Sequence, residues 1–521
     1  MPYQLESKQP FSSSLLWGLQ RRYFEETGFE AWRRGEVPHY ITSNPRIAAA
    51  YAQMVIALYK DTIATAGGSV HQPFYIAELG GGSGRFAFYL MKSIVALSEQ
   101  ENIPVNSFKY ILTDFTQSNL DFWRIHPCLQ IFFEDGLMDI ALFDATQKNN
   151  FHMQLAGVTI GPGQLQNPLC VVANYLFDSI PQELFYCKDK QALPCLVSIT
   201  TDTEDDPAEL TAAEILENLS VDYHYANDMI PFFSHGPTEK ILDHYREHFE
   251  QAYVFIPDRG IRCMEHLQSF SNGGMMLLSS DKGHHMEEFV SNETPPGIVK
   301  HGSFSLSVNY HALKMYAEYA GAKVMFPGHL HGSIHTGCFL FVKNARRLVL
   351  TQNTFQQYFS DSGPDDYYNV YTFFRDNPDI IPFHSIVSAL RISLYDSHQL
   401  EKFLPGLMRL AKEMEGPEKK DVIEIIGKCW ENYYPLGEGN DLANKIASFL
   451  YEIDAYISAI SYFRLSSRLY GNDTATVYNL AVCYYMTGEF DNSIELLKRL
   501  VGNGNDSEVL DLLQQCERAA G

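Results

Sequence analysis

One short segment constrains the fold more than any other part of the chain. An apolar stretch ends at Glu78 and is followed at once by the glycines Gly80, Gly82 and Gly84. Glycine has no Cβ and tolerates positive φ, so this spacing lets the backbone turn sharply and approach a ligand closely. Because residues 85–102 have a helical pattern, the segment predicts a strand, a ligand-binding loop and a helix in succession.

Three classes of ligand use such a loop. A P-loop needs a Lys-Ser or Lys-Thr pair after the glycines, and the chain has none there. A dinucleotide site would have a third glycine where Arg85 stands, which weakens this interpretation without removing it. S-adenosylmethionine has no phosphates and is cationic, so the acid at position 78 suits it. A tight turn without any ligand also remains open, because an isolated glycine motif is a weak signal.

Polar residues recur at the ends of the next predicted strands. Asp114 ends a second apolar strand, Asp144 lies at the end of a third, and Asn174 ends a fourth. Ligands of open α/β sheets bind outside the carboxyl ends of the strands, so this series favours a cofactor pocket over isolated helix caps. We expect Asp114 to accept the ribose hydroxyls and Asp144 the adenine amino group. The expected cofactor-binding residues are Glu78, Gly80, Gly82, Gly84, Asp114, Phe115, Asp144, Ala145, Asn174 and Tyr175.

The order of these motifs resembles the class I S-adenosylmethionine-dependent methyltransferases, and within them the MidA-like group that includes the mitochondrial complex I assembly-factor methyltransferase. The similar segments are residues 40–45, 78–84, 174–181, 274–283 and 301–310, within a region of roughly 38–343. The resemblance implies an α/β fold with a Rossmann-like, mostly parallel seven-stranded sheet and an N-terminal helical cap. It also implies S-adenosylmethionine as cofactor, and places Thr42 and Ser43 at the substrate.

The chain departs from the family pattern at three places. Gly81 stands where the family usually has Pro, Tyr175 where it has Glu, and Lys282 where it has Tyr. These departures concern the substrate more than the cofactor. The resemblance implies arginine methylation, because some members of the group carry it out.

The expected reaction is methyl transfer to a nitrogen of a protein side chain. A guanidinium acceptor is protonated and delocalised, so nearby carboxylates should bind it and localise its charge. Asp178 and Glu183, just beyond the fourth strand, are the candidate catalytic residues. Two alternatives stay open: a non-catalytic assembly factor or scaffold that keeps the fold and binds a partner, and a nicotinamide-dependent oxidoreductase built on the same sheet.

The chain should have three parts. Residues 1–70 form the helical cap, and 71–346 form the methyltransferase domain, with an insertion at about 188–255 that contains an acidic run at 201–206 and a predicted helix at 210–219. Residues 347–521 should be helical. There, Ala447 and Phe463 recur 34 residues later as Ala481 and Leu497, the tetratricopeptide period. Such repeats would bind a protein partner or form a homodimer, although a plain helical bundle is the alternative.

Composition narrows the partners and the compartment. A net charge of −24 argues against nucleic acid, which is bound by neutralising phosphates. No apolar run reaches the length of a membrane span, and nine scattered cysteines without a C-x-x-C pair predict reduced thiols in the cytoplasm. His329, His331 and His335 could be metal ligands, but no carboxylate or cysteine lies at a supporting spacing, so we predict no metal site.

Overall fold

The structure is a computed structural model that describes residues 3–37, 39–64, 71–203, 205–226, 236–377, 380–437, 439–471, 473–502 and 507–520. The chain divides into two compact units, Met1–Tyr368 and Asn369–Gly521.

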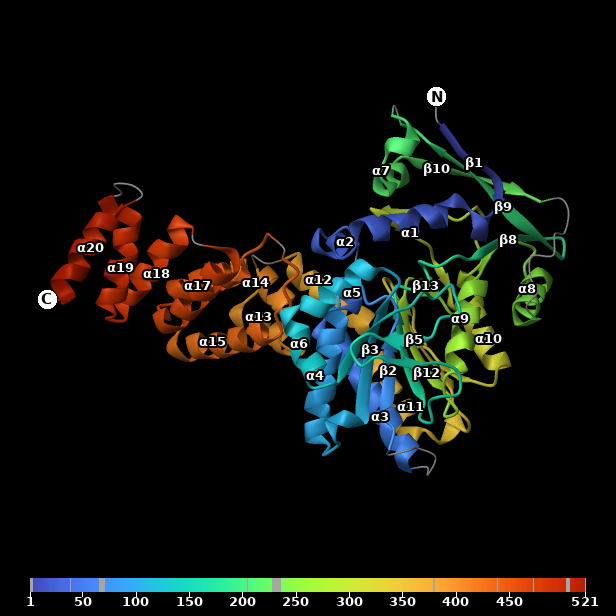
Figure 1. The fold of residues 1–521 in the computed structure, drawn as a ribbon, viewed down its shortest axis with the longest axis horizontal. Helices are drawn as coiled ribbons and strands as arrows, with labels where there is room; N and C mark the ends of the chain where they lie inside the picture. Colours follow the sequence, from blue (N-terminus) through green and yellow to red (C-terminus); the bar gives the residue numbers. More distant parts are fainter. Residues whose placement is uncertain are drawn as a thin grey trace. The chain divides into compact units, whose positions relative to one another are not determined.

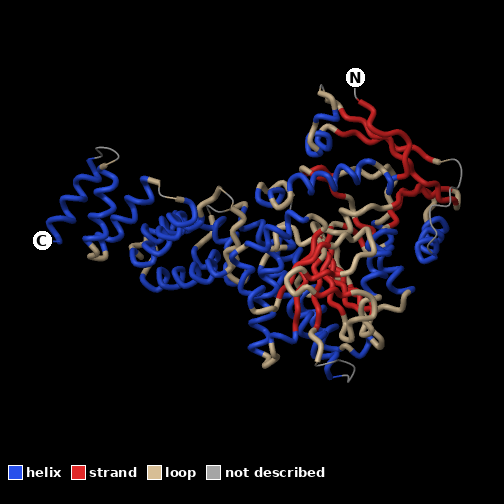
Figure 2. Tube along the Cα trace, viewed as in Figure 1, coloured by secondary structure: helices blue, strands red, loops and turns tan. Residues whose placement is uncertain are grey.

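A seven-stranded sheet forms the centre of the first unit (Figures 1 and 2). Its strand order is β17-β18-β12-β7-β2-β3-β4. The five strands from β12 to β4 are parallel, and β18 runs antiparallel to both of its neighbours. The strands are β2 (Phe74–Glu78), β3 (Phe108–Asp114), β4 (Met138–Leu142), β7 (Leu169–Asn174), β12 (Met275–Asp281), β17 (Lys323–Met325) and β18 (His335–Phe341).

Helices cover both faces of this sheet. On one face, α9 and α10 pack against apolar side chains of the strands, including Ala77, Val171 and Leu277. On the other, the Tyr59 ring of α3 packs at a steep angle against Phe74 and Phe108, with ring centroids 5.1 and 5.2 Å away. The helices are α3 (Pro45–Ala64), α4 (Arg85–Gln100), α5 (Gln117–Ile125), α6 (Pro127–Glu134), α9 (Asp258–Gln268) and α10 (Tyr310–Tyr319).

The helical segment that follows β3 is divided into α5 and α6. Pro127 has no amide hydrogen and disfavours helical geometry in the residue before it. His126 therefore has extended backbone angles, ends α5, and caps α6 by accepting a hydrogen bond from the Cys128 amide.

A second, antiparallel sheet was not expected from the sequence. Its order is β1-β9-β8-β11, and β10 also pairs with β9 (Figure 1). Residues 1–70 are therefore not wholly helical, because β1 pairs with the insertion. The predicted helix at 210–219 is shorter, and residues 204 and 227–235 of the insertion lie outside the described ranges. The elements are β1 (Tyr3–Pro10), β8 (Glu183–Lys188), β9 (Gln191–Thr201), β10 (Leu219–Tyr225), β11 (Gln251–Ile256) and α7 (Ala212–Glu217).

The helical part of the cap is α1 (Leu15–Thr27) with the short α2 (Glu30–Arg33). In Figure 1, α1 runs between the two sheets. Trp17 anchors it, since its indole donates a 2.8 Å hydrogen bond to the Phe11 carbonyl and its ring lies 5.3 Å from that of Phe304. The helix is therefore held over the carboxyl ends of the parallel strands.

The second unit begins at Asn369 and not at the expected residue 347. Helix α11 (Val349–Phe355) belongs to the first unit because the buried Asp61 carboxylate of α3 binds its first turn. The Thr351 amide and hydroxyl donate to Asp61 at 2.8 and 2.9 Å. A carboxylate at a helix N-terminus also interacts favourably with the helix dipole. Helix α12 (Pro364–Arg375) spans the division between the units.

Helical hairpins make up the second unit. Ala447 and Ala481 are fully buried at corresponding positions, and the turns between the paired helices place Asp454 and Gly488, 34 residues apart, at φ 61° and 78°. Membership of the tetratricopeptide class stays a prediction. The helices are α13 (Phe383–Ile392), α14 (Ser397–Leu410), α15 (Gly416–Glu431), α16 (Leu442–Glu452), α17 (Tyr456–Tyr470), α18 (Thr474–Met486), α19 (Phe490–Val501) and α20 (Ser507–Ala520). Within the described ranges, no helix combines the length and hydropathy needed to cross a bilayer.

Candidate functional site

Two adjoining cavities lie at the carboxyl ends of the parallel strands, beneath α1. The larger, of about 330 Å³, extends over Asp114, Phe115 and Asp144, and is called here the large chamber. The smaller, of about 100 Å³, lies over Glu78 and Asn174 and is called the small chamber. Gly80, Tyr175, Phe24, Trp32 and Ser179 line both chambers, so the two form one site. The larger alone is within the usual size range of ligand pockets.

The glycine loop forms the floor between the chambers. Gly80 and Gly82 have φ angles of 66° and 52°, which L side chains rarely adopt. A Cβ on Gly82 would lie 2.6 Å from the Trp32 ring of the cap, so the backbone approaches the covering residue closely. The Trp123 indole donates a 3.0 Å hydrogen bond to the Gly82 carbonyl from below. Gly84 caps α4 with φ 74° and does not line either chamber, contrary to expectation.

Glu78 supplies a buried acid to the small chamber. Its carboxyl group accepts a 2.7 Å hydrogen bond from the Tyr110 hydroxyl. Burial raises the pKa of Glu78 to about 8, although the Tyr110 hydrogen bond opposes this rise. A carboxyl group in this state is stabilised in its charged form by a cation that enters beside it.

Asp114 has two roles, because it stabilises the glycine loop and also lines the large chamber. Its carboxylate accepts hydrogen bonds from the Gly82 amide at 3.2 Å, from Asn119 at 3.0 Å and from the Thr116 amide and hydroxyl at 3.0 Å each. Burial raises the pKa of Asp114, and these donors oppose the shift. The residue therefore fixes the glycine turn, and it lines the chamber where a ligand hydroxyl could reach it.

Asn174 has a donor without a partner. Its side-chain oxygen accepts from the Tyr51 hydroxyl at 2.8 Å and from the Ser280 amide at 3.2 Å, which fixes the orientation of the amide. Its buried Nδ2 has no hydrogen-bond partner among the described residues. An unsatisfied buried donor costs roughly 1–3 kcal/mol. A ligand atom in the small chamber that accepts a hydrogen bond from Asn174 Nδ2 would remove this cost.

The next residue, Tyr175, has a φ of 49° and lines both chambers. Its amide donates a 3.0 Å hydrogen bond to the Ser280 carbonyl. Left-handed backbone at a residue with a side chain costs energy and is concentrated at functional sites. The fourth strand thus ends in two residues, Asn174 and Tyr175, whose geometry is set by the strand beside it.

Asp144 lines the large chamber, where the sequence predicts a contact with the cofactor, but its carboxylate already has partners. Instead of offering a free carboxylate, Asp144 forms a 2.6 Å ion pair with Arg21 of α1 and accepts from Thr146. The Thr146 donors and Arg21 lower the pKa of Asp144 against the opposing effect of burial. The Arg21 guanidinium also lies 4.8 Å above the Phe115 ring. The Arg21 guanidinium therefore covers Phe115 and Asp144, the two residues that the sequence predicts to contact the adenine ring.

The expected catalytic pair is also different. Asp178 lines the small chamber, but Glu183 lines neither chamber and accepts a hydrogen bond from the Ser12 hydroxyl in the second sheet. The neighbour of Asp178 is Asp281, the last residue of β12, whose carboxylate accepts from the Asp178 amide at 3.2 Å. Burial raises the pKa of Asp178 to about 6, and burial together with the charge of Asp178 raises the pKa of Asp281 well above its usual value.

Thr42 and Ser43, the predicted substrate-binding residues, line the small chamber. Both hydroxyls donate to the His39 carbonyl, at 3.1 and 2.7 Å. The His39 ring is fixed as well, because its Nδ1 donates to the Val37 carbonyl at 3.0 Å and its Nε2 accepts from Arg85 at 3.2 Å. Burial and the positive charge of Arg85 lower the pKa of His39 to about 4, so the ring is a neutral wall of the site at physiological pH.

Sequence reasoning missed several residues of the site. Arg21, Trp32 and His39 come from the cap, where helical periodicity gave no reason to separate them from ordinary surface or core residues. Asp281 is different, since it ends an apolar strand exactly as Glu78 and Asp114 do. Extending the rule of acidic strand ends to the fifth strand would have found it.

No known family profile and no curated protein matches the chain. Among solved structures, the chain is similar to a candidate methyltransferase from Burkholderia thailandensis bound to S-adenosylhomocysteine, with 13% identity over 67% of this chain and 83% of the other, at a TM-score of 0.41. It is also similar to the magnesium protoporphyrin IX methyltransferase from Synechocystis with bound S-adenosylhomocysteine, with 9% identity over 63% and 99% and a TM-score of 0.28. Likenesses this distant say nothing about the activity of this chain, which has to be inferred from its own site.

Proposed function

We propose that this protein is an S-adenosylmethionine-dependent methyltransferase. The observation that carries the proposal is the pairing, in one cavity at the strand ends, of the buried acid Glu78 with the unpartnered amide donor of Asn174. An amino-acid ligand end that has both an ammonium and a carboxylate satisfies the two together. A pyrophosphate would oppose the ionisation of Glu78 instead of favouring it.

The fit extends to the large chamber. Asp114 and Phe115 offer a hydroxyl acceptor and an aromatic surface, which suit a ribose and an adenine. Gly82 lets the loop pass close beneath the cap, where a Cβ would collide with Trp32. When bound, S-adenosylmethionine would supply an electrophilic methyl group on a sulfonium; the chain itself supplies orientation and electrostatics.

For the acceptor, we propose a nitrogen of a protein side chain, with arginine favoured. Asp178 supports this choice because it presents a carboxyl group to the small chamber, and Asp281 lies behind it. Two adjacent carboxyl groups ionise in separate steps, so one proton is held between them at neutral pH. The ionised group can bind a cationic side chain, and Asp178 Oδ can take the proton that a nitrogen gives up on methylation.

Cofactor binding is tested by calorimetry with S-adenosylmethionine. Gly82→Asp should abolish binding, because its side chain would collide with Trp32 and place a second acid beside Asp114. The matched control is Gly136→Asp, a position that also has positive φ, at 67°, but open space around the new Cβ. Equal binding by wild type and Gly82→Asp, or protection by NAD instead of S-adenosylhomocysteine, would end the proposal.

Catalysis is tested separately from binding. Asp178→Asn should keep S-adenosylmethionine affinity within about threefold and lose at least 100-fold in methylation of a co-purified partner, as expected for loss of a proton-accepting group. If that variant keeps full biological activity with no methylated arginine on any partner, the protein is instead a scaffold. Its partner would then bind to the helical hairpins of the second unit.

A further inference from the structure

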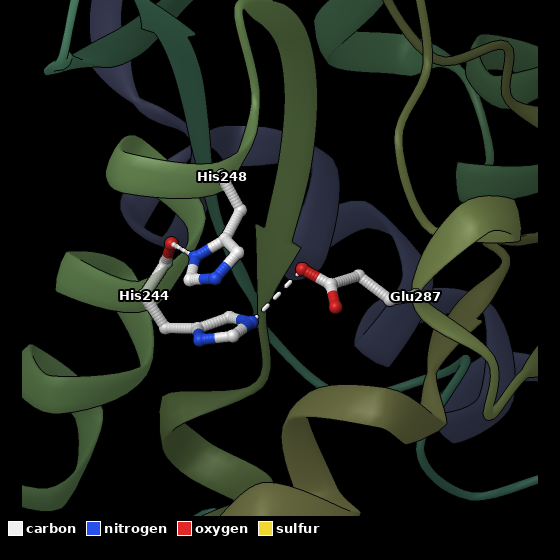
Figure 3. A group of neighbouring side chains, drawn as sticks. All are labelled: His244, His248 and Glu287. Atoms are coloured by element: carbon white, nitrogen blue, oxygen red, sulfur yellow. Dashed lines mark hydrogen bonds and ion pairs between the residues drawn. The ribbon is translucent and has the colours of Figure 1, made fainter.

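A cluster of metal-ligating side chains lies outside the two chambers. His244 and His248 of α8 (Gly236–His248) face Glu287 of the short helix η5 (Glu287–Phe289), as Figure 3 shows. One possible ligand atom from each of the three residues lies within 4.8 Å of the other two. His244 Nε2 and Glu287 Oε1 are 2.9 Å apart. We propose that these three side chains bind a divalent transition-metal ion of the Zn²⁺ type.

The spacing on the helix is the first argument. Residues four apart lie one above the other on the same face of an α-helix, so both imidazoles extend from the same side of α8. Their ring centroids are 3.9 Å apart, with the planes inclined by 25°. In Figure 3 the two rings lie one above the other, with the Glu287 carboxylate to one side of them.

Protonation of the rings is the second argument. A carbonyl can only accept, so the 2.8 Å contact between His248 Nδ1 and the His244 carbonyl places a proton on Nδ1. The neutral ring then carries its lone pair on Nε2. Ligating histidines usually donate their other ring nitrogen in just this way, which fixes the ring and increases its basicity. His248 is therefore oriented as a ligand before any metal arrives.

The donor set selects the metal. Two imidazoles and one carboxylate are ligands for Zn²⁺ and its first-row neighbours, whereas Ca²⁺ and Mg²⁺ prefer all-oxygen sites. Tetrahedral bonds of about 2.1 Å separate adjacent ligand atoms by about 3.4 Å. His244 and Glu287 would thus move apart by about 0.5 Å, and the metal would displace the proton from His244 Nε2 to solvent. Water would complete the coordination.

Metal binding would join two distant parts of the chain. Helix α8 belongs to the insertion, while Glu287 lies five residues after Lys282, which lines the small chamber. The ion would therefore attach the segment between Lys282 and Glu287, which begins at the wall of the small chamber, to helix α8 of the insertion. Here the prediction of no metal site, which considered His329, His331 and His335, overlooked the H-x-x-x-H spacing at 244 and 248.

The test is titration of the metal-free full chain with Zn²⁺, followed by calorimetry. Wild type should bind one equivalent that His248→Ala and Glu287→Gln weaken by at least about 100-fold, more than loss of a supporting group usually costs. His248 is exposed, so its replacement should leave the fold intact. The matched control is His384→Ala, an exposed histidine of helix α13, which should bind as wild type does.

Hydrogen exchange locates the ion independently of activity. Zn²⁺ should slow amide exchange in residues 284–292 of wild type, a chelator should reverse this, and His248→Ala should show neither effect. Failure of wild type to bind Zn²⁺ would overturn the proposal and leave His244 and Glu287 as an ordinary ion pair. Retention of the full equivalent by His248→Ala would also overturn it, since the ion would then be bound by other histidines.

Discussion

Arg21 provides the sharpest test of how the cofactor enters the large chamber. Its guanidinium stacks on Phe115 and pairs with Asp144, the two groups that an adenine ring would contact. Adenine and Arg21 therefore compete for one surface. We predict that Arg21→Ala binds S-adenosylhomocysteine more tightly than wild type does.

The size of the effect follows from the two contacts. The Arg21 side chain is 43% exposed, so solvent screens its ion pair to less than about 1 kcal/mol, and an exposed cation–π contact adds about 0.5–1 kcal/mol. A total of about 0.5–2 kcal/mol corresponds to roughly 2- to 30-fold in affinity.

Calorimetry of wild type, Arg21→Ala and a control measures this effect. The control is Arg22→Ala, which removes a neighbouring arginine that pairs with Glu26 and does not line the chambers. Its affinity should equal that of wild type. Weaker binding by Arg21→Ala would refute the competition, because it would mean that Arg21 closes over the ligand and contacts it.

Two further predictions concern stability. Because burial raises the pKa of Glu78 to about 8, the folded state holds its proton more tightly than the unfolded state does, and this favourable contribution is lost as pH rises from about 4.5 to 8. Glu78→Gln should therefore raise Tm more at pH 8 than at pH 5, and the difference should be equivalent to a few kcal/mol. Equal Tm shifts at the two pH values in thermal denaturation would contradict this prediction. A chain ending at residue 368 should unfold as one cooperative unit. A chain ending at residue 346 lacks α11, whose amides donate to the buried Asp61 carboxylate, and should be less stable by about 1–3 kcal/mol or more. Equal denaturation midpoints for the two truncated chains would disprove the assignment of α11 to the first unit.

The strand ends could be predicted because two local signals coincide there. Continuous apolar runs mark strands buried on both faces, and a polar residue at the end of each run marks the edge where ligands bind. Glu78, Asp114 and Asn174 each end a strand as expected. The 34-residue offset of Ala447 and Ala481 was equally readable, since burial at corresponding positions restricts both to small side chains.

The parts that failed depend on partners far away in the sequence. Strand β1 is mostly exposed and lacks alternation, so nothing local distinguishes it from a loop until β9 pairs with it. The state of Asp144 was hidden for a similar reason, because Arg21 lies 123 residues earlier. Glu183 was assigned by its position after a strand, but it turns into the second sheet, whose existence the sequence did not indicate.

The pairing of β1 with β9 also orders events during synthesis. Residues 3–10 are translated almost two hundred residues before their partner strand, residues 191–201. Contacts of such separation form late, because a long loop must close first. Helix α1, which covers the chambers, directly follows β1. We therefore expect α1 to pack in place only after the central strands beneath it have left the ribosome. A nascent chain would then expose its glycine loop and strand-end acids for many seconds, a period in which a ligand could enter from above and be enclosed when α1 packs over it.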